Sequence, residues 1–131
     1  MLERRKISGE YTMVGRRSKN YALLKQLHET ACTQEEALSI VKTVSHQYGI
    51  TVSVVRFREG VRGRAYCKTF ALSLPATPGA GFGRLRVGIV LHELAHLIAF
   101  HRFKERAHRR PFLSLLDYLG HEWSKHHGNS D

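Results

Sequence analysis

The segment from His92 to His96 holds the side chains of this chain that are best suited to chemistry. Its sequence, His-Glu-Leu-Ala-His, places two imidazoles four residues apart, with a carboxylate directly after the first. Residues at i and i+4 share one face of a helix, so His92 and His96 can bind one metal ion together. Glu93 can then reach a water molecule on that ion as a general base. The spacing predicts a zinc-dependent hydrolase, most simply a metallopeptidase.

The surroundings of this HExxH motif separate it from a chance match. Although 9 of the 131 residues are histidines, only about 0.04 accidental matches are expected in such a chain. Almost every other residue between Val87 and Phe100 is apolar, and ionisable groups are costly to bury there without a role. The plainer alternative is a helix with two satisfied histidines and a surface carboxylate. It leaves this clustering unexplained, so the pattern favours metal binding.

A third metal ligand must come from beyond the motif, because catalytic zinc usually has three protein ligands and an open position. His101 lies about 140° round the helix from His96, so it faces elsewhere. His108 follows the predicted helix, in a connection that can fold back over the metal. The spacing favours His108 as the third ligand. Three residues of the last predicted helix remain as alternatives: Asp117, His121 and Glu122.

Two segments together resemble the SprT-like zinc metallopeptidases. In that family, HExxH is followed after a variable gap by a third histidine in a His-Gly-x-x-Phe/Trp-like motif. The matching segment here is His108–Phe112, with Arg109 in place of the glycine. The resemblance implies a zincin-like single domain of α+β class, with Zn²⁺ held by His92, His96 and His108. It also implies that Glu93 takes a proton from water and passes it to the leaving amine.

A peptidase also needs a hydrogen-bond donor for the oxyanion of the transition state. Our principal candidates are Tyr118 and His121, with Tyr66 and Arg109 as others, and the sequence does not choose among them. In zincin-like folds, a strand that precedes the motif helix often forms the edge along which a peptide lies extended. The strand predicted from Thr69 to Leu74 is expected to do so. Main-chain hydrogen bonds would then bind a peptide or protein substrate with limited side-chain selectivity.

The elements around the motif follow from hydrophobic periodicity and turn residues. A short helix is predicted from about Asn20, and a second begins at a capping box of Thr33 and Glu36 and stops at Gly49. Strands are predicted at 50–57, 64–66 and 69–74, and helices from 84 or 85 to 103 and from Pro111 onward. The expected fold is α+β, a small three-stranded sheet packed on the motif helix with flanking helices. Residues 1–19 are expected to form a basic arm, 20–127 one domain and 128–131 a tail.

The charge of the chain suggests a second class of function. Its 21 Lys and Arg against 11 Asp and Glu give a net charge of +10 at pH 7. A surface with this charge attracts nucleic acid, acidic proteins or anionic membranes. An ordinary solvated basic surface is the plainer alternative. SprT-like proteins include peptidases that act on DNA-bound proteins, so resemblance and charge together imply nucleic-acid-associated substrates. The alternative function is a basic nucleic-acid-associated binding protein with a structural or non-proteolytic zinc site. The cations gather in two segments: Arg4, Arg5, Lys6, Arg16, Arg17 and Lys19, and then Arg102, Lys104, Arg106, Arg109 and Arg110.

The cysteines and apolar segments indicate the compartment. Cys32 and Cys67 show neither metal-binding nor disulfide-framework spacing, so reduced thiols are expected. The first residues are basic and polar, unlike a secretion signal, and the longest apolar run is interrupted by the motif. The sequence therefore predicts a cytoplasmic protein without a membrane partner, and it leaves the oligomeric state open.

Overall fold

Four helices and three strands make up the fold in the computed structural model, which describes residues 21–127. The predicted basic arm at 1–19 and the tail at 128–131 lie outside the described residues. The class is α+β with a small three-stranded open sheet, as the sequence predicts. The elements in order are α2 (Tyr21–Leu27), α3 (Gln34–Tyr48), β1 (Val54–Arg58), β2 (Arg64–Tyr66), β3 (Ala71–Pro75), α4 (Val87–Phe103) and α5 (Arg110–His127).

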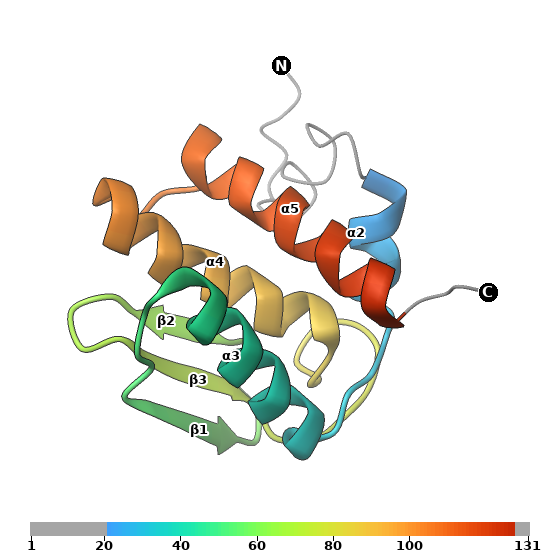
Figure 1. The fold of residues 1–131 in the computed structure, drawn as a ribbon. Coiled ribbons are helices and arrows are strands. Elements are labelled where there is room, and N and C mark those ends of the chain that lie inside the picture. The colour runs from blue at the N-terminus through green and yellow to red at the C-terminus, as the bar shows by residue number, and fades with distance from the viewer. Residues whose placement is uncertain (1–20, 128–131) are drawn as a thin grey trace.

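Helix α4, which carries the HExxH motif, is the centre of the molecule. It contacts α2, α3, α5, β2 and β3, and Figure 1 shows it between the sheet and α5. Its sequence is apolar on nearly all sides, so it can be covered on all sides. Leu94, Leu97 and Ile98 are fully buried as a result. A helix held in this way gives the motif a rigid base.

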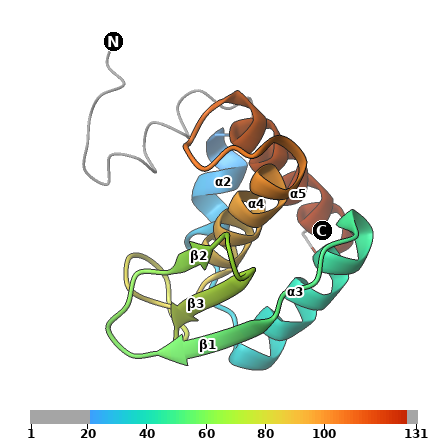
Figure 2. The same ribbon diagram turned by 90° about the vertical axis from the view of Figure 1, so that its left-hand side faces the viewer.

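The strand order of the sheet is β1-β3-β2, which places β3 in the middle. β1 pairs with β3 in parallel, with Val54 opposite Ala71, and β2 pairs with β3 antiparallel, with Ala65 opposite Leu72. The prediction that the strand at 69–74 is a substrate-binding edge is therefore wrong, because β3 has neighbours on both sides and is buried along its whole length. The edge strand that contacts α4 is β2 (Figure 2).

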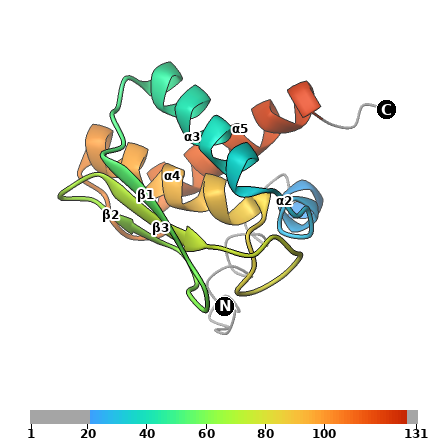
Figure 3. The same ribbon diagram turned by 90° about the horizontal axis from the view of Figure 1, so that it is seen from below.

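The helices all lie on one face of this sheet. Seen from below, the strands lie in front of α4, which contacts β2 and β3 (Figure 3). Leu72 and Leu74 of β3 are fully buried, and they belong to the same hydrophobic core as the apolar residues of α4. None of the described helices covers the opposite face, so the hydrophobic core lies between the sheet and the helices.

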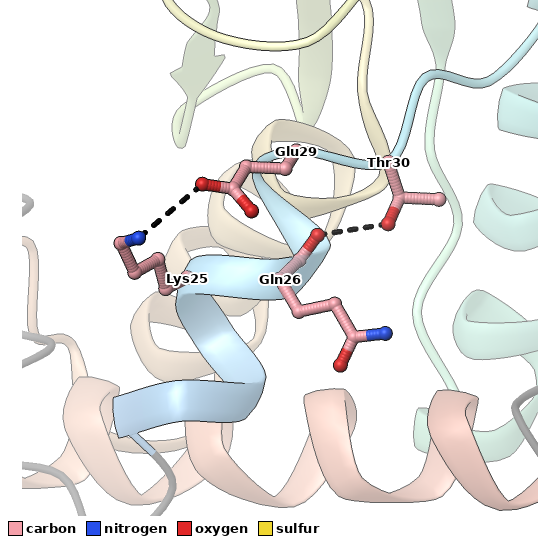
Figure 4. Close-up of polar contacts among 4 residues, drawn as sticks. All are labelled: Lys25, Gln26, Glu29 and Thr30. Carbon is pink, nitrogen blue, oxygen red and sulfur yellow. Dashed lines mark hydrogen bonds and ion pairs between the residues drawn. The ribbon is translucent and has the colours of Figure 1, made fainter.

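The ends of the first two helices are set by local hydrogen bonds. Thr33 and Glu36 form the predicted capping box, with the Thr33 hydroxyl accepting from the Glu36 N–H at 3.0 Å, and Gly49 ends α3 in the left-handed conformation at φ 66°. After α2, the Thr30 hydroxyl donates to the Gln26 carbonyl at 2.8 Å, and Lys25 lies 3.5 Å from Glu29 (Figure 4). The predictions for α3 are confirmed at both ends.

Three strand and helix starts fall later than the sequence predicts. The strand predicted at 50–57 begins only at Val54, because the Ile50 N–H bonds back to the Ser45 carbonyl at the end of α3. The strand predicted from Thr69 begins at Ala71, since Phe70 turns the chain at φ 56°. α4 begins at Val87 rather than 84 or 85, because Leu85 is extended and exchanges backbone hydrogen bonds with Cys32 and Thr77.

Neither cysteine forms a disulfide. Cys32 is buried and Cys67 is half-buried, and both are free thiols. In the part of the chain that the structure describes, no helix combines the length and the apolar character needed to cross a membrane.

Candidate metal centre

Three imidazoles meet beside the middle of α4. The Nε2 atoms of His96 and His108 are 3.1 Å apart, and those of His108 and His92 are 3.3 Å apart. One ring nitrogen from each residue lies within 4.8 Å of the others, so the three histidines could hold a metal ion. The structure thus brings together the motif histidines and the candidate third ligand, His108.

The separations of these nitrogens fit a tetrahedral metal ion. Zn–N bonds of about 2.0–2.1 Å at tetrahedral angles place neighbouring ligand atoms about 3.3 Å apart. The two shortest Nε2 separations, 3.1 and 3.3 Å, match that value. Imidazole nitrogen suits zinc, copper, iron and nickel, so the donor set by itself defines a class of transition metals rather than one element.

His108 reaches the motif because the chain reverses sharply after α4. Lys104 adopts the left-handed conformation at φ 58°, and its N–H bonds to the carbonyls of the last turn of α4. The Glu105 carboxylate then accepts from the Ala107 N–H at 2.9 Å and lies 3.9 Å from the Arg109 side chain. These contacts fold the connection between α4 and α5 back over the motif and fix the backbone on both sides of His108.

Phe112 of α5 holds the three ligand rings in place. It is fully buried, and its ring stacks on that of His96 with centroids 4.3 Å apart. The rings of His92 and His108 meet it edge-on, at 5.0 and 4.8 Å. One aromatic side chain therefore limits the rotation of all three imidazoles, which favours a preformed ligand set.

The surroundings keep the motif histidines neutral, as metal binding requires. Burial lowers the pKa of His96 to about 4, with a further contribution from His108. Burial also lowers the pKa of His92 well below its usual value, and His96 and His108 add to that effect. Near pH 7 each of these two rings is therefore uncharged and has one nitrogen lone pair available to a cation.

Glu93 lies on the inner side of the same helix turn. Only 6% of its surface is exposed, and it lines the same hollow as the three histidines. Gly63, just before β2, makes this arrangement possible: a β-carbon there would lie 2.7 Å from Ile89 Cγ1 and 3.4 Å from Glu93 Oε2. The backbone at Gly63 also has φ +111°, which only glycine adopts readily. The close approach of this loop packs the sheet edge against the carboxylate.

The hollow in front of the histidines measures about 560 Å³. On one side it is bounded by β2 and the residues that follow it, and on the other by α4 and the α4–α5 connection. Cys67 lies inside it, and burial raises the pKa of its thiol, so the sulfur stays protonated at neutral pH. The lining residues are Gly63, Arg64, Ala65, Tyr66, Cys67, Lys68, Thr69, His92, Glu93, His96, Arg106 and His108.

Among the candidate oxyanion donors, Tyr66 lines this hollow and the two principal candidates do not. Tyr118 is 54% exposed on α5 and lines a separate hollow with Tyr48 and Arg102. His121 is exposed further along α5, and Arg109 is exposed and paired with Glu105. The structure therefore gathers His92, Glu93, His96, His108 and Tyr66 in one place.

The alternative third ligands also lie apart from the metal group. Glu122 pairs with Lys125 and His126 on α5, at 3.8 and 4.0 Å. Asp117, partly buried on α5, and His121 are likewise outside the group that His92, His96 and His108 form. His101, as predicted, faces elsewhere and contacts Phe70 edge-on.

A buried histidine–arginine pair supports the start of α4, and sequence reasoning missed it. The Arg86 Nε–H donates to His28 Nδ1 at 3.0 Å, and both side chains are buried. Burial, followed by the charge of Arg86, lowers the pKa of His28 to about 3. The signal was present, since Arg86 is a lone charge between apolar residues at the head of an apolar helix. Gly63, Cys67 and Lys68 were missed for another reason, because only the fold brings them to the metal.

Comparison of the chain with protein-family models, with curated protein sequences and with solved structures gives no match.

Proposed function

We propose that this protein is a zinc-dependent metallopeptidase with a zincin-like, SprT-like domain. The observation that carries the proposal is the meeting of the His92, His96 and His108 nitrogens beside the buried Glu93 carboxylate in one open hollow. A purely structural zinc site has no need of a general base on the same helix turn. The contacts of Phe112 with all three rings support the resemblance of the segment from His108 to Phe112.

In the proposed reaction, His92, His96 and His108 would hold Zn²⁺ beside the hollow. When bound, zinc supplies Lewis-acid chemistry, which activates water and polarises a carbonyl group. Glu93 accepts the proton of the attacking water and delivers it to the leaving amine. Tyr66, which lines the hollow, would donate a hydrogen bond to the developing oxyanion.

The substrate would lie along β2 rather than along β3. β2 is an edge strand, it contacts α4, and its residues line the hollow at the histidines. An extended peptide can add to such an edge through main-chain hydrogen bonds, which would carry its backbone past the metal. This pairing presents a peptide bond to the metal without requiring one particular side chain.

The decisive experiment combines metal analysis with a proteolysis assay of the Glu93→Gln variant. We expect one zinc per chain in both proteins, and loss of at least about a thousandfold in kcat for the variant, since the general base is removed while the ligands remain. Zinc content is measured by elemental analysis, and activity with an internally quenched peptide mixture.

The matched control is Glu35→Gln, an exposed glutamate at the start of α3 that lies far from the lining of the hollow. It should retain both zinc and activity. Proteolysis that persists in Glu93→Gln at the level of Glu35→Gln would rule out the proposed mechanism. Loss of zinc from Glu93→Gln would show that Glu93 is a ligand instead of a base.

The second candidate function is nucleic-acid binding, with the metal in a structural role. The end of α4, the connection that follows it and the first residue of α5 carry five exposed cations within nine residues. Phosphate contacts from such residues weaken steeply as salt rises. The cations concerned are Arg102, Lys104, Arg106, Arg109 and Arg110.

A further inference from the structure

The rim of the metal hollow carries charge of one sign. Arg64, Lys68 and Arg106 all line it and are all exposed. Among the residues that the structure describes, Glu93 is the only carboxylate in the lining, and it is buried beside the histidines. The next carboxylate along the connection, Glu105, already accepts from the Ala107 N–H and pairs with Arg109. A bound dication would make the hollow more positive still.

Two of these cations are held in position by aromatic rings. The guanidinium of Arg64 lies 5.3 Å from the ring centroid of Tyr66, and that of Arg106 lies 5.0 Å from that of Phe100. Stacking of this kind restrains a long side chain while leaving its N–H groups free to bind an anion. Among the described residues, none of the three cations takes part in an ion pair. Their charge is therefore available to a ligand.

The cations flank the hollow on both sides of the metal group. Arg64 belongs to β2 and Lys68 follows that strand, whereas Arg106 stands across the hollow in the α4–α5 connection, two residues before His108. A peptide extended along β2 presents successive side chains to opposite faces of the sheet. Those side chains near the bond at the metal that face the hollow would meet the cations that line it.

Building on the proposed peptidase function, we infer that the hollow selects substrate segments with aspartate or glutamate side chains beside the bond at the metal. Lysine and arginine at those positions meet like charges, which excludes basic segments as effectively as acidic ones are attracted. The selectivity comes from Arg64, Lys68 and Arg106 together. A peptide fits this surface better than a nucleic acid does, because β2 offers a free strand edge for main-chain pairing within the same hollow.

The test is peptide binding to the zinc-loaded Glu93→Gln variant, which separates binding from turnover. Three fluorescein-labelled peptides share one length and sequence, except that the variable positions are all Asp, all Asn or all Lys. We expect fluorescence anisotropy to give the tightest Kd for the Asp peptide, about tenfold below that of the Asn peptide, since several exposed ion pairs each contribute modestly. The Lys peptide should bind most weakly. Equal Kd values for the Asp and Asn peptides would overturn the inference.

Charge reversal identifies the residues responsible. In the Glu93→Gln background, Lys68→Glu and Arg106→Glu should each lower the ratio of the Kd of the Asn peptide to that of the Asp peptide. With both substitutions the ratio should fall below one, so that the Asn peptide binds more tightly than the Asp peptide. The matched control is Lys42→Glu, because Lys42 is an exposed cation of α3 outside the lining. It makes the same change in net charge and should leave the ratio unaltered. A ratio that falls equally in Lys42→Glu would assign the preference to overall charge and contradict the proposed site.

Two further measurements separate the acidic preference from the peptidase proposal and from nucleic-acid binding. If the zinc-loaded wild-type protein cleaves none of the three peptides while the Asp peptide still binds preferentially, the peptidase proposal fails and the acidic preference stands. If it cleaves all three with equal kcat/KM and binding shows no order, the preference alone fails. A last measurement uses an unlabelled single-stranded oligodeoxynucleotide to compete with the labelled Asp peptide. If the oligonucleotide displaces the labelled peptide at a lower concentration than unlabelled Asp peptide does, the inference is overturned and the cations are assigned to nucleic-acid binding.

Discussion

Tyr66 and Tyr118 are two partly exposed tyrosines that differ in one respect that matters for catalysis. Tyr66 lines the metal hollow, whereas Tyr118 lies on α5 beside Tyr48 and Arg102. A hydroxyl can stabilise an oxyanion only where the oxyanion forms, and removal of one such donor costs about a hundredfold or more in kcat.

We therefore expect Tyr66→Phe to lower kcat about a hundredfold with little change in KM, and Tyr118→Phe to leave both within about twofold. Steady-state kinetics with one quenched peptide measures the two variants side by side. Because both changes remove a single hydroxyl, each serves as the control for the other. The reverse result, with kcat lost only in Tyr118→Phe, would mean that α5 moves toward the metal during the reaction.

The sequence could predict the candidate metal ligands because their chemistry is local. His92 and His96 follow from helix geometry, and His108 from the resemblance of a five-residue segment. The proposed oxyanion donor was not predictable in the same way. Tyr118 and His121 are sequence neighbours of the site on the next helix, but α5 turns those positions toward solvent. Tyr66 comes from the sheet, and only the pairing of β2 with β3 brings it to the hollow.

At the scale of elements, the sequence predicted the order of helices and strands but not the sheet topology. Capping residues marked both ends of α3 correctly, because a cap depends on a few adjacent residues. The position of β3 depends on long-range pairing, with β1 on one side and β2 on the other. The buried run Ala71–Pro75 was the available signal, since a strand covered throughout is typical of a sheet interior.

The contact between α2 and α4 gives a prediction about Gly88. A β-carbon at this position would lie 2.6 Å from Cγ of the buried His28 ring. We expect Gly88→Ala to lower the free energy of unfolding by about 1–3 kcal/mol, because the ring must leave its place and its hydrogen bond with Arg86. Chemical denaturation followed by circular dichroism measures the change.

The effect of Gly88→Ala on the free energy of unfolding should change sign when the clash with His28 is removed. In a His28→Ala background, Gly88→Ala replaces a helical glycine without a steric cost and should stabilise the protein by about 0.5–1 kcal/mol. A Gly88→Ala effect that is equally destabilising in both backgrounds would contradict the packing of α2 against α4. The double comparison is needed because His28→Ala alone also leaves the Arg86 donor without its acceptor.

At the scale of the whole molecule, buried histidines link the stability of the fold to pH. In the folded chain the pKa of His96 is about 4 and that of His28 about 3, against a usual value of 6.5. Below pH 6.5 these two histidines become protonated in the unfolded chain but stay neutral in the folded chain. The free energy of unfolding of the metal-free protein should therefore fall as the pH drops from about 6.5 toward 4, by up to about 1.4 kcal/mol per pH unit for each such histidine.

Zinc bound at the proposed site would stabilise the folded state, because the unfolded chain has no preformed site. At pH 7.5 we expect a chelator to lower the Tm, zinc to restore it, and His108→Ala to abolish the zinc-dependent part, as measured by differential scanning fluorimetry. His46→Ala, an exposed histidine of α3, is the matched control and should keep the full response. The zinc-dependent part should persist below pH 6.5 and shrink only toward about pH 4, where His96 of the folded chain begins to take up a proton in competition with zinc. A zinc response of equal size in His108→Ala and His46→Ala would remove His108 from the ligand set, and with it the element that distinguishes this site from a two-histidine surface motif.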